Sequence, residues 1–213
     1  MFNVIFDMDG TLLDTQRVHI DAWEYAGMQQ GFEGLGQYMS KTCGMNLEGW
    51  SAFAKEVCPQ LDIEKFVQDE FNYVQNNLTI QLKPGALSLL EFLREYEIKM
   101  AVASGTDTET VRKFLNTVGV LDYFDVIVGG EQVKNSKPNP DIFLKAASLM
   151  NVTPKSCFVF EDSLNGIKAA VLADMKCIGI PDLVPFNDVA KEFLFAIIPS
   201  LDKGIDLLRS YVD

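Results

Sequence analysis

The sequence is poor in positive charge, in paired cysteines and in long apolar runs. Its 18 Lys and Arg residues face 30 Asp and Glu residues, which gives a formal net charge of -12. Nucleic-acid binding depends mostly on clustered Lys and Arg, so we expect no nucleic-acid partner. The four cysteines, Cys43, Cys58, Cys157 and Cys177, form no CxxC pair. We therefore expect reduced thiols rather than disulfide bridges.

The apolar runs are too short for a membrane span, which requires about 18 residues. The chain also enters an apolar segment within a few residues of Met1, without a basic leader. We therefore expect a cytoplasmic protein without a membrane partner. Hydrophobic residues still make up 48% of the 213 positions. A chain of this size can bury a full core and also hold an inserted subdomain.

The most informative feature that is present is a pair of carboxylates, Asp7 and Asp9, which follows the apolar residues 2–6 and precedes Gly10. Like charges at the end of a buried strand disfavour each other's ionisation unless a cation compensates them or one keeps a proton. With a divalent metal, Asp7 would be ligand and nucleophile. Asp9 would offer its backbone carbonyl to the ion and its side chain as general acid and base. The alternative is an ordinary turn, because Asp and Gly favour turns.

Two rhythms divide the rest of the chain. Residues 16–30 and 63–76 place apolar side chains at helical spacing, which predicts a helical segment from 15 to about 80. Beyond residue 83, apolar runs alternate with helical stretches, which predicts an α/β core whose parallel sheet has helices on both faces. The expected strands are residues 99–103, 126–128, 157–160, 177–180 and 195–198. We therefore expect a core of residues 1–14 and 83–213, with a helical insert at 15–82.

Ser104 and Gly105 follow the second of the expected core strands. Thr106 and Glu109 are spaced as a capping box for the next helix. A hydroxyl and backbone amides beside a helix start form a plausible cradle for phosphate or another oxyanion. A plain capped turn explains the same residues, so both interpretations stay open here.

Lys137 stands before Pro138, which keeps it out of helical backbone geometry. Asn139 and Pro140 fit the cap and the first position of the next helix. The lysine is therefore held on a stiff corner, which a flexible surface lysine does not need. We interpret Lys137 as functional, with a solvated surface charge as the alternative.

A second carboxylate pair, Glu161 and Asp162, follows the expected strand at 157–160. Such a pair supplies further oxygen ligands for Mg²⁺, and a helix-capping role for Asp162 is compatible with this. Ligands of open α/β sheets bind at the carboxyl ends of the strands. The sequence therefore predicts that one sheet edge gathers Asp7, Asp9, Ser104, Lys137, Glu161 and Asp162.

These segments resemble the four motifs of the haloacid dehalogenase superfamily. The DxDGTxxD segment begins at Asp7, the SG pair at Ser104, the KPxPxxF segment at Lys137 and the ED pair at Glu161. The match covers essentially the whole chain. It is most similar to the branch with a helical cap after the first motif, which includes β-phosphoglucomutase and many sugar phosphatases. The resemblance implies a Rossmann-like catalytic core with an inserted α-helical cap.

The resemblance also implies roles for single residues. Asp7 would attack phosphorus to give an aspartyl phosphate, and Asp9 would protonate the leaving oxygen and then activate water. Mg²⁺ would be bound by Asp7, the Asp9 carbonyl and Asp162, with Glu161 nearby as a further metal-site residue. The implied phosphate-binding residues are Thr11, Ser104, Gly105 and Lys137. Members that dehalogenate lack the second aspartate of the first motif, so Asp9 argues against dehalogenation.

Substrate choice should lie in the cap. There Thr15, His19 and Trp23 resemble positions that β-phosphoglucomutase and some hexose phosphate phosphatases share, and Lys41 is a further candidate. The spacing of four between His19 and Trp23 is also what packing of a helix face demands. For these two residues, core packing therefore remains an equal alternative to substrate binding.

A mutase must hold a second phosphate, and arginine is the natural residue for this because it binds phosphate bidentately. Residues 14–82 contain four basic residues against ten acidic ones, and Leu47 stands roughly where the mutase carries its arginine. We therefore predict a Mg²⁺-dependent phosphatase of small organic phosphates, most of all sugar phosphates, that acts as a monomer. The alternatives are an isomerase of the β-phosphoglucomutase type and a non-catalytic binding module.

Overall fold

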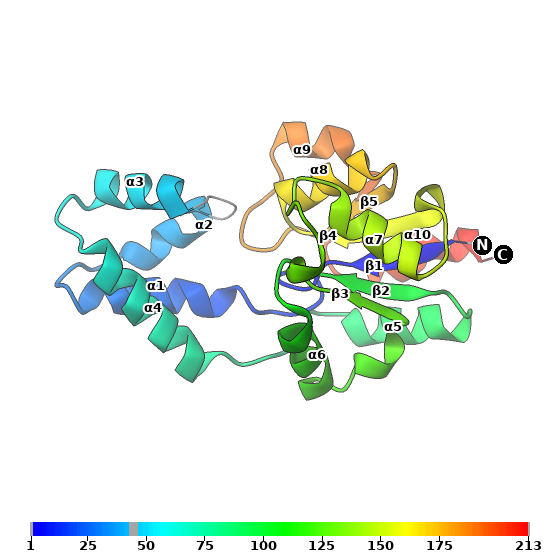
Figure 1. Ribbon diagram of the computed structural model, residues 1–213, viewed down its shortest axis with the longest axis horizontal. Helices are drawn as coiled ribbons and strands as arrows, with labels where there is room; N and C mark the ends of the chain where they lie inside the picture. The colour runs from blue at the N-terminus through cyan, green and yellow to red at the C-terminus, as the bar shows by residue number, and fades with distance from the viewer. Residues whose placement is uncertain (1, 43–46, 213) are drawn as a thin grey trace. The chain divides into compact units, whose positions relative to one another are not determined.

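The computed structural model describes residues 2–42 and 47–212 (Figure 1). The chain forms two compact units. The core unit contains Met1–Asp14 and Ile80–Asp213, and the helical unit contains Thr15–Thr79. No helix among the described residues is long and apolar enough to cross a membrane.

The core unit is built on one sheet of six strands, all of them paired in parallel. The strands are β1 (Asn3–Phe6), β2 (Met100–Ala103), β3 (Val126–Val128), β4 (Cys157–Glu161), β5 (Lys176–Gly179) and β6 (Ala196–Ile197). Their order across the sheet is β3-β2-β1-β4-β5-β6. The predicted α/β architecture is confirmed. The strand order reverses at β1, so the crevice where such sheets bind ligands opens beside this strand.

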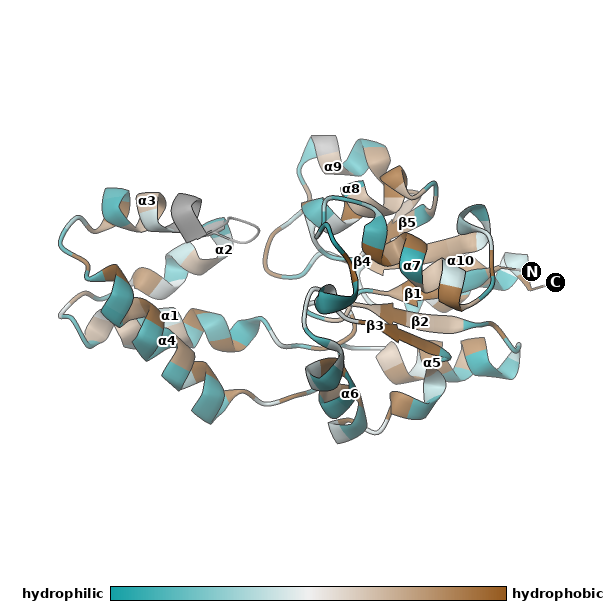
Figure 2. Ribbon diagram, in the orientation of Figure 1, coloured by the Kyte–Doolittle hydropathy of each residue, from teal (hydrophilic) through white to brown (hydrophobic). Residues whose placement is uncertain are grey.

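The strands form because they are short, apolar and buried, as the predominantly apolar ribbons of the sheet in Figure 2 illustrate. All residues of β1, β2 and β4 are buried. Parallel sheets are covered on both faces, and their strands therefore read as continuous apolar runs rather than as an alternating pattern. Phe6 is in register with Val102 of β2 and Phe160 of β4. The residues that follow these strands are thus delivered to one edge.

Helices cover both faces of the sheet. One face packs α5 (Ala86–Glu95), α6 (Thr108–Thr117) and α10 (Lys203–Leu208) around a cluster that includes Phe6 and Phe160. The other face packs α7 (Asp141–Leu149), α8 (Leu164–Leu172) and α9 (Asp188–Phe193) around Ile5 and Val159. The short 3-10 helices of this unit are η2 (Leu121–Tyr123), η3 (Gly130–Gln132), η4 (Pro154–Ser156) and η5 (Arg209–Tyr211).

The helical unit has its own small core. Its elements are α1 (Arg17–Met28), η1 (Leu35–Tyr38), α2 (Met39–Thr42), α3 (Leu47–Val57) and α4 (Ile63–Asn77). The rings of Trp23 on α1 and Phe66 on α4 meet edge to face at 5.3 Å. The carboxylate of Glu24 accepts hydrogen bonds from the N–H groups of Gly34 (2.7 Å) and Gly36 (3.0 Å). Helix α1 therefore organises both the core and the turn that follows it.

The division between the units falls three residues earlier than the predicted boundary at 82. Residues 80–82 belong to the core unit because they pair with the segment that leaves it. Asp14 N–H donates to Gln81 O and Lys83 N–H donates to Leu12 O, each at 2.9 Å. Leu82 also packs against the apolar cluster of the core. This pairing of distant segments leaves no mark in composition, so the sequence did not reveal it.

Candidate active site

Asp7 stands directly after β1, at the centre of the sheet. Its N–H donates to Phe160 O at 3.0 Å, so the ladder between β1 and β4 holds its backbone. The chain then folds back, because the N–H groups of Leu12 and Leu13 both donate to Met8 O. Gly10 makes this loop possible by adopting a φ of +82°, which favours glycine. The local sequence thus fixes Asp7, which is only 7% exposed, at the carboxyl edge.

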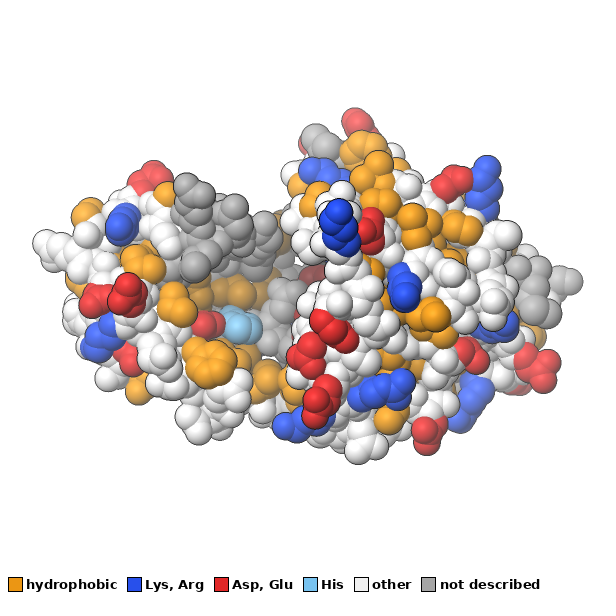
Figure 3. All heavy atoms as spheres, viewed as in Figure 1, with side chains coloured by type: hydrophobic (Ala, Val, Ile, Leu, Met, Phe, Trp, Pro, Cys, Tyr) orange, Lys and Arg blue, Asp and Glu red, His pale blue; other side chains and the backbone are white. Residues whose placement is uncertain are grey.

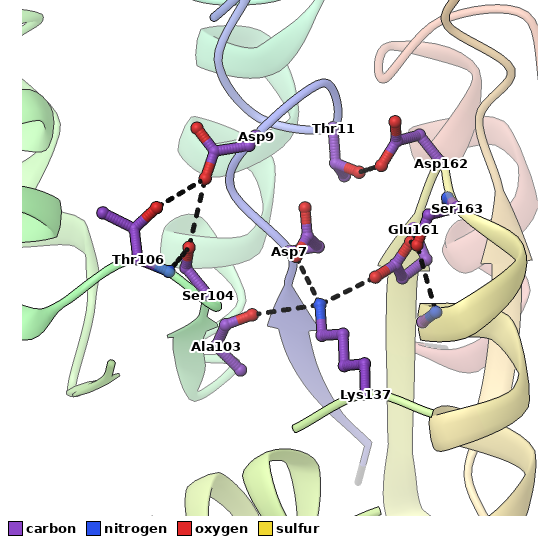
Figure 4. Close-up of polar contacts among 11 residues, drawn as sticks. Asp7, Asp9, Thr11, Ala103, Ser104, Thr106, Lys137, Glu161, Asp162 and Ser163 are labelled. Carbon is purple, nitrogen blue, oxygen red and sulfur yellow. Dashed lines mark hydrogen bonds and ion pairs between the residues drawn. The ribbon is translucent and has the colours of Figure 1, made fainter. Parts of the chain in front are cut away.

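Lys137 reaches Asp7 between the ends of β1 and β4 (Figure 4). Its Nζ forms an ion pair with Asp7, donates to Glu161 at 2.7 Å and approaches Ala103 O at 3.4 Å. The ammonium group also lies 4.8 Å from the centre of the Phe143 ring. This lysine, whose side chain is only 13% exposed, is therefore a positive charge held between two carboxylates at this edge. On the face seen in Figure 3, other basic side chains stand among acidic and apolar ones.

The electrostatics of this group follow from burial. Burial raises the pKa of Asp7 well above its usual range, Lys137 opposes this, and the charges of Glu161, Asp162 and Asp9 add to it. Burial also works against the charge of Lys137, but Asp7 and Glu161 outweigh it and raise the pKa of the ammonium group. Lys137 is therefore positively charged throughout the physiological range. The negative charge on Asp7 depends on that lysine or on a further cation.

Glu161 holds Lys137 in place. One of its carboxylate oxygens accepts from Lys137, and the other accepts from Ser163 N–H (2.7 Å) and Ser163 Oγ (2.9 Å). A Cβ on Gly166 would lie 1.6 Å from the Glu161 carboxylate, so only glycine fits in this first turn of α8. A place for Glu161 near the metal stays a prediction. Its observed contacts position the lysine.

The corner that carries Lys137 differs in detail from the prediction. Helix α7 begins at Asp141, with Pro140 in the cap position. The side chain of Asn139 does not cap this helix and donates instead to Ser136 O at 3.1 Å. The hydrogen bond between Asn139 and Ser136 therefore closes a turn that ends just before the cap residue Pro140. Lys137 projects from that turn toward β1 and β4.

Asp9 lies in a different environment from Asp7. Its Oδ2 accepts from the hydroxyls of Ser104 (3.2 Å) and Thr106 (3.0 Å). Thr106 N–H in turn donates to Ser104 Oγ at 3.0 Å. The predicted capping box at Thr106 is wrong, because Asp107 caps α6 by accepting from the N–H of Thr110. Thr106 is thereby free of helix capping and serves Asp9 instead.

Asp162 completes the edge on the β4 side. Its Oδ1 accepts a hydrogen bond from the hydroxyl of Thr11 at 3.1 Å. The predicted phosphate-binding residue Thr11 thus donates its hydroxyl to a carboxylate in this structure. Burial, followed by the charge of Glu161, raises the pKa of Asp162 to about 7. Gly105, the remaining predicted phosphate-binding residue, follows Ser104 and is exposed.

The donor set at this edge suits a hard cation. Asp7 and Asp162 are carboxylates whose charged forms are disfavoured by burial, and a divalent ion would offset that cost. Among the described residues, no group of three or more His, Cys, Asp or Glu side chains gathers as a metal cluster. A cation here therefore also requires oxygens that are not side chains, and the backbone carbonyl of Asp9 is of the type that Mg²⁺ accepts.

The candidate substrate residues of the helical unit have separate surroundings. Trp23 is 7% exposed and packs on Phe66, as the packing interpretation expects, and a substrate role stays a prediction. His19 Nδ1 lies 2.6 Å from a carboxylate oxygen of Glu70. Thr15 is buried. Lys41 is exposed, with its Nζ 5.3 Å from the centre of the Tyr38 ring.

Four positions just before Leu47, the residue that stands roughly where the mutase carries its arginine, lie outside the described residues. These are positions 43–46, and the side chain of Leu47 is not described either.

Sequence reasoning missed Ser163 and Thr106 as partners of Glu161 and Asp9. Ser163 was detectable as a serine three residues before Gly166, the spacing of an N-cap, and its hydroxyl does accept from Gly166 N–H at 3.0 Å.

Comparison with known proteins identifies the class. A family model of haloacid dehalogenase-like hydrolases matches residues 3–174. The chain therefore belongs to the haloacid dehalogenase-like hydrolases, as its motifs suggest.

Particular relatives are similar over nearly the whole chain. The phosphorylated carbohydrates phosphatase of Thermotoga maritima is 33% identical over 211 residues, 97% of this chain and 90% of the relative. The fructose-1-phosphate phosphatase YqaB of Escherichia coli is 32% identical, over 83% of this chain and 95% of the relative. The crystal structure of beta-phosphoglucomutase from Clostridium difficile is 25% identical, with a TM-score of 0.72 over 100% of this chain and 97% of that one.

Proposed function

We propose that this hydrolase is a Mg²⁺-dependent phosphatase of small phosphorylated carbohydrates that acts through an aspartyl phosphate on Asp7. The observation that carries the proposal is the separation of two neighbouring carboxylates into different environments. Asp7 is buried against Lys137, whereas Asp9 is held by two hydroxyl groups. Two carboxylates in distinct surroundings suit distinct roles, one as nucleophile and one as acid and base.

Each residue of the edge has a part in this reaction. The Asp7 carboxylate attacks phosphorus, and Asp9 gives a proton to the leaving oxygen and later takes one from the attacking water. Lys137, the Ser104 hydroxyl and the backbone amide of Gly105 stabilise the charge on the equatorial phosphoryl oxygens. Mg²⁺, held by Asp7, Asp162 and the Asp9 carbonyl, would add further charge neutralisation when bound.

The substrate class is inferred from relatives and from charge. Two relatives that match most of the chain are named as phosphatases of phosphorylated carbohydrates and of fructose 1-phosphate. Because the protein has a net charge of -12, an anionic substrate needs a local positive charge, and the ammonium group of Lys137 beside Asp7 provides one. We keep Thr15, His19, Trp23 and Lys41 as candidate substrate residues, with core packing as the alternative for Trp23, which is 7% exposed.

Release of inorganic phosphate tests the proposal. The protein is incubated with a panel of hexose, pentose and nucleoside monophosphates, with Mg²⁺ and with EDTA. We expect turnover of one or more sugar phosphates in Mg²⁺ only, and none by the Asp7→Asn variant, which keeps the volume of the side chain but loses the nucleophile. Turnover by Asp7→Asn equal to that of the wild type would overturn the mechanism.

A mutase activity is the second candidate, because the beta-phosphoglucomutase of Clostridium difficile shares the fold over the whole chain. Against it stand the four basic residues among positions 14–82, which leave little positive charge for a second phosphate. Incubation with β-glucose 1-phosphate and a trace of glucose 1,6-bisphosphate separates the two. Glucose 6-phosphate that accumulates faster than free phosphate would replace the phosphatase proposal with the mutase.

A further inference from the structure

A second buried ion pair lies in the core unit, outside the group around Lys137. Lys83 Nζ and Asp182 Oδ1 are 2.5 Å apart, and the side chains are only 8% and 1% exposed. Burying two charges costs desolvation energy that their attraction repays poorly, so a buried ion pair is weak evidence for a purely stabilising role. A functional reason for its position is therefore worth seeking.

Backbone hydrogen bonds join the segments that carry this pair to Glu161, which precedes Asp162, and to Leu12, which follows its partner Thr11. Asp182 follows β5 in the loop that begins at Ile180, whose N–H donates to Glu161 O at 2.8 Å. Its negative charge acts on Asp162 and contributes to the raised pKa of that residue. On the other side, Lys83 N–H donates to Leu12 O at 2.9 Å, next to Thr11.

Thr11 is the residue whose hydroxyl donates to Asp162. The segment of Lys83 is therefore bonded to the loop of Thr11, and the segment of Asp182 to the end of β4. The backbone of Lys83 holds the loop that supplies the Thr11 donor, and the charge of Asp182 acts on the Asp162 carboxylate. Because both charges are buried, solvent screens them little.

We propose that Lys83 and Asp182 are positioning residues that set the charge balance of the cation subsite at Asp7 and Asp162. This inference rests on the proposed Mg²⁺-dependent function. Asp182 increases the attraction of the subsite for a divalent cation, and Lys83 limits that attraction by neutralising Asp182. Removal of either partner leaves one uncompensated charge, and the two removals leave charges of opposite sign.

The test measures Mg²⁺ binding directly, by isothermal titration of the metal-free protein with MgCl₂, for the wild type, Lys83→Met, Asp182→Asn and the double variant. We expect Asp182→Asn to weaken Mg²⁺ binding and Lys83→Met to strengthen it, each by roughly fourfold or more, because one unit charge acts on a divalent ion over a short distance. The double variant should return to within about twofold of the wild type, because the net charge is restored.

A purely structural role would give a different result. Loss of the contact would then weaken Mg²⁺ binding in both single variants, and the double variant would be no better than either. Weaker Mg²⁺ binding in both single variants, a double variant no better than either single variant, or unchanged affinity in both single variants would each overturn the inference. If Lys83→Met does not fold, Asp182→Asn and the double variant still decide, because recovery of affinity by adding the second change is expected only from charge balance.

An exposed ion pair elsewhere in the core unit provides the control. Lys155 and Asp174 are 3.4 Å apart with side chains 80% and 71% exposed. Lys155→Met and Asp174→Asn make the same chemical changes at the surface and should leave Mg²⁺ affinity unaltered. If the wild type binds no Mg²⁺ and its phosphate release ignores the metal, the proposed function fails instead. If the wild type binds Mg²⁺ and only the signs disagree, the charge-balance inference fails alone.

Discussion

Lys137 Nζ lies 2.7 Å from Glu161, and the same ammonium group pairs with Asp7. The carboxylate of Glu161, the last residue of β4, therefore fixes the lysine that pairs with Asp7, the residue after β1. Ser163 occupies the other oxygen of Glu161, so the glutamate has a defined orientation. Ser163 thus orients Glu161, Glu161 holds Lys137, and Lys137 pairs with Asp7.

Removing the lysine should destabilise the protein as well as inactivate it. Lys137→Met leaves Asp7 and Glu161 buried without their counter-charge, a change that typically costs about 3–5 kcal/mol. Urea denaturation at pH 8 should show this loss, and phosphate release should disappear. Lys134→Met, at an exposed position three residues away, is the control and should change neither quantity. An unfolding free energy of Lys137→Met equal to that of the wild type would contradict the account.

The tight contact at Gly166 predicts the effect of a single methyl group. A Cβ there would lie 1.6 Å from the Glu161 carboxylate, so Gly166→Ala must displace Glu161 and, with it, Lys137. We expect kcat/KM for phosphate release to fall at least tenfold, and stability to fall by about 1–3 kcal/mol. Lys168→Ala, at an exposed position of the same helix, controls for changes in helix propensity. Full activity of Gly166→Ala would show that the position of Glu161 does not matter.

The hydroxyl of Thr106 should matter for the proton-transfer residue and little for substrate binding. Thr106→Val removes one of the two hydroxyl donors to Asp9 and keeps the shape of the side chain. We expect kcat to fall roughly tenfold, as for a mispositioned acid and base, with KM changed less than about twofold. Thr117→Val in α6, where the hydroxyl donates to Lys113 O at 2.8 Å, is the matched control. A change confined to KM would refute a role in positioning Asp9.

Glu24 should give the helical unit a pH-dependent stability. The N–H groups of Gly34 and Gly36 hold the pKa of Glu24 below its usual range. A lowered pKa contributes stability that is present above the unfolded-state value, about 4.3, and is lost as the pH falls through the folded-state value.

The matching variant is Glu24→Gln. It should lower the unfolding free energy by about 1–2 kcal/mol at pH 7, and the gap to the wild type should close as the pH falls below 4. Thermal melts of both proteins across this range measure the effect, with exposed Glu33→Gln as control. A gap that widens toward acid would have the wrong sign and would exclude this carboxylate as the cause.

The sequence predicted the order of the core elements and the gathering of acidic and basic residues at one edge. Those predictions rested on local patterns, because apolar strands, glycine turns and proline corners each leave their mark over a few residues. Asp7, Ser104, Lys137 and Glu161 were found in this way, and the structure brings all four to the carboxyl ends of β1, β2 and β4.

The rest depended on contacts between distant segments. The ion pair of Lys83 and Asp182 joins residues 99 positions apart, and the pairing of residues 81–83 with 12–14 moved the boundary of the helical unit. Thr106 looked like a helix cap because its spacing allowed it, whereas Asp107 took that role. Patterns in one sequence do not show which of two candidate residues caps a helix, because this depends on the neighbours that the fold brings to each residue.

The central claim is that the phosphoryl group passes through Asp7, and trapping of the covalent intermediate tests it most directly. The protein is mixed with a turned-over sugar phosphate labelled with ³²P, in Mg²⁺, quenched in acid within milliseconds and digested, and the labelled peptide is identified by mass spectrometry. We expect the label on Asp7 in the wild type, a larger labelled fraction in Asp9→Ala and no label in Asp7→Asn. A label on any other residue, or its absence from a wild-type protein in steady turnover with Asp9→Ala also unlabelled, would contradict the account.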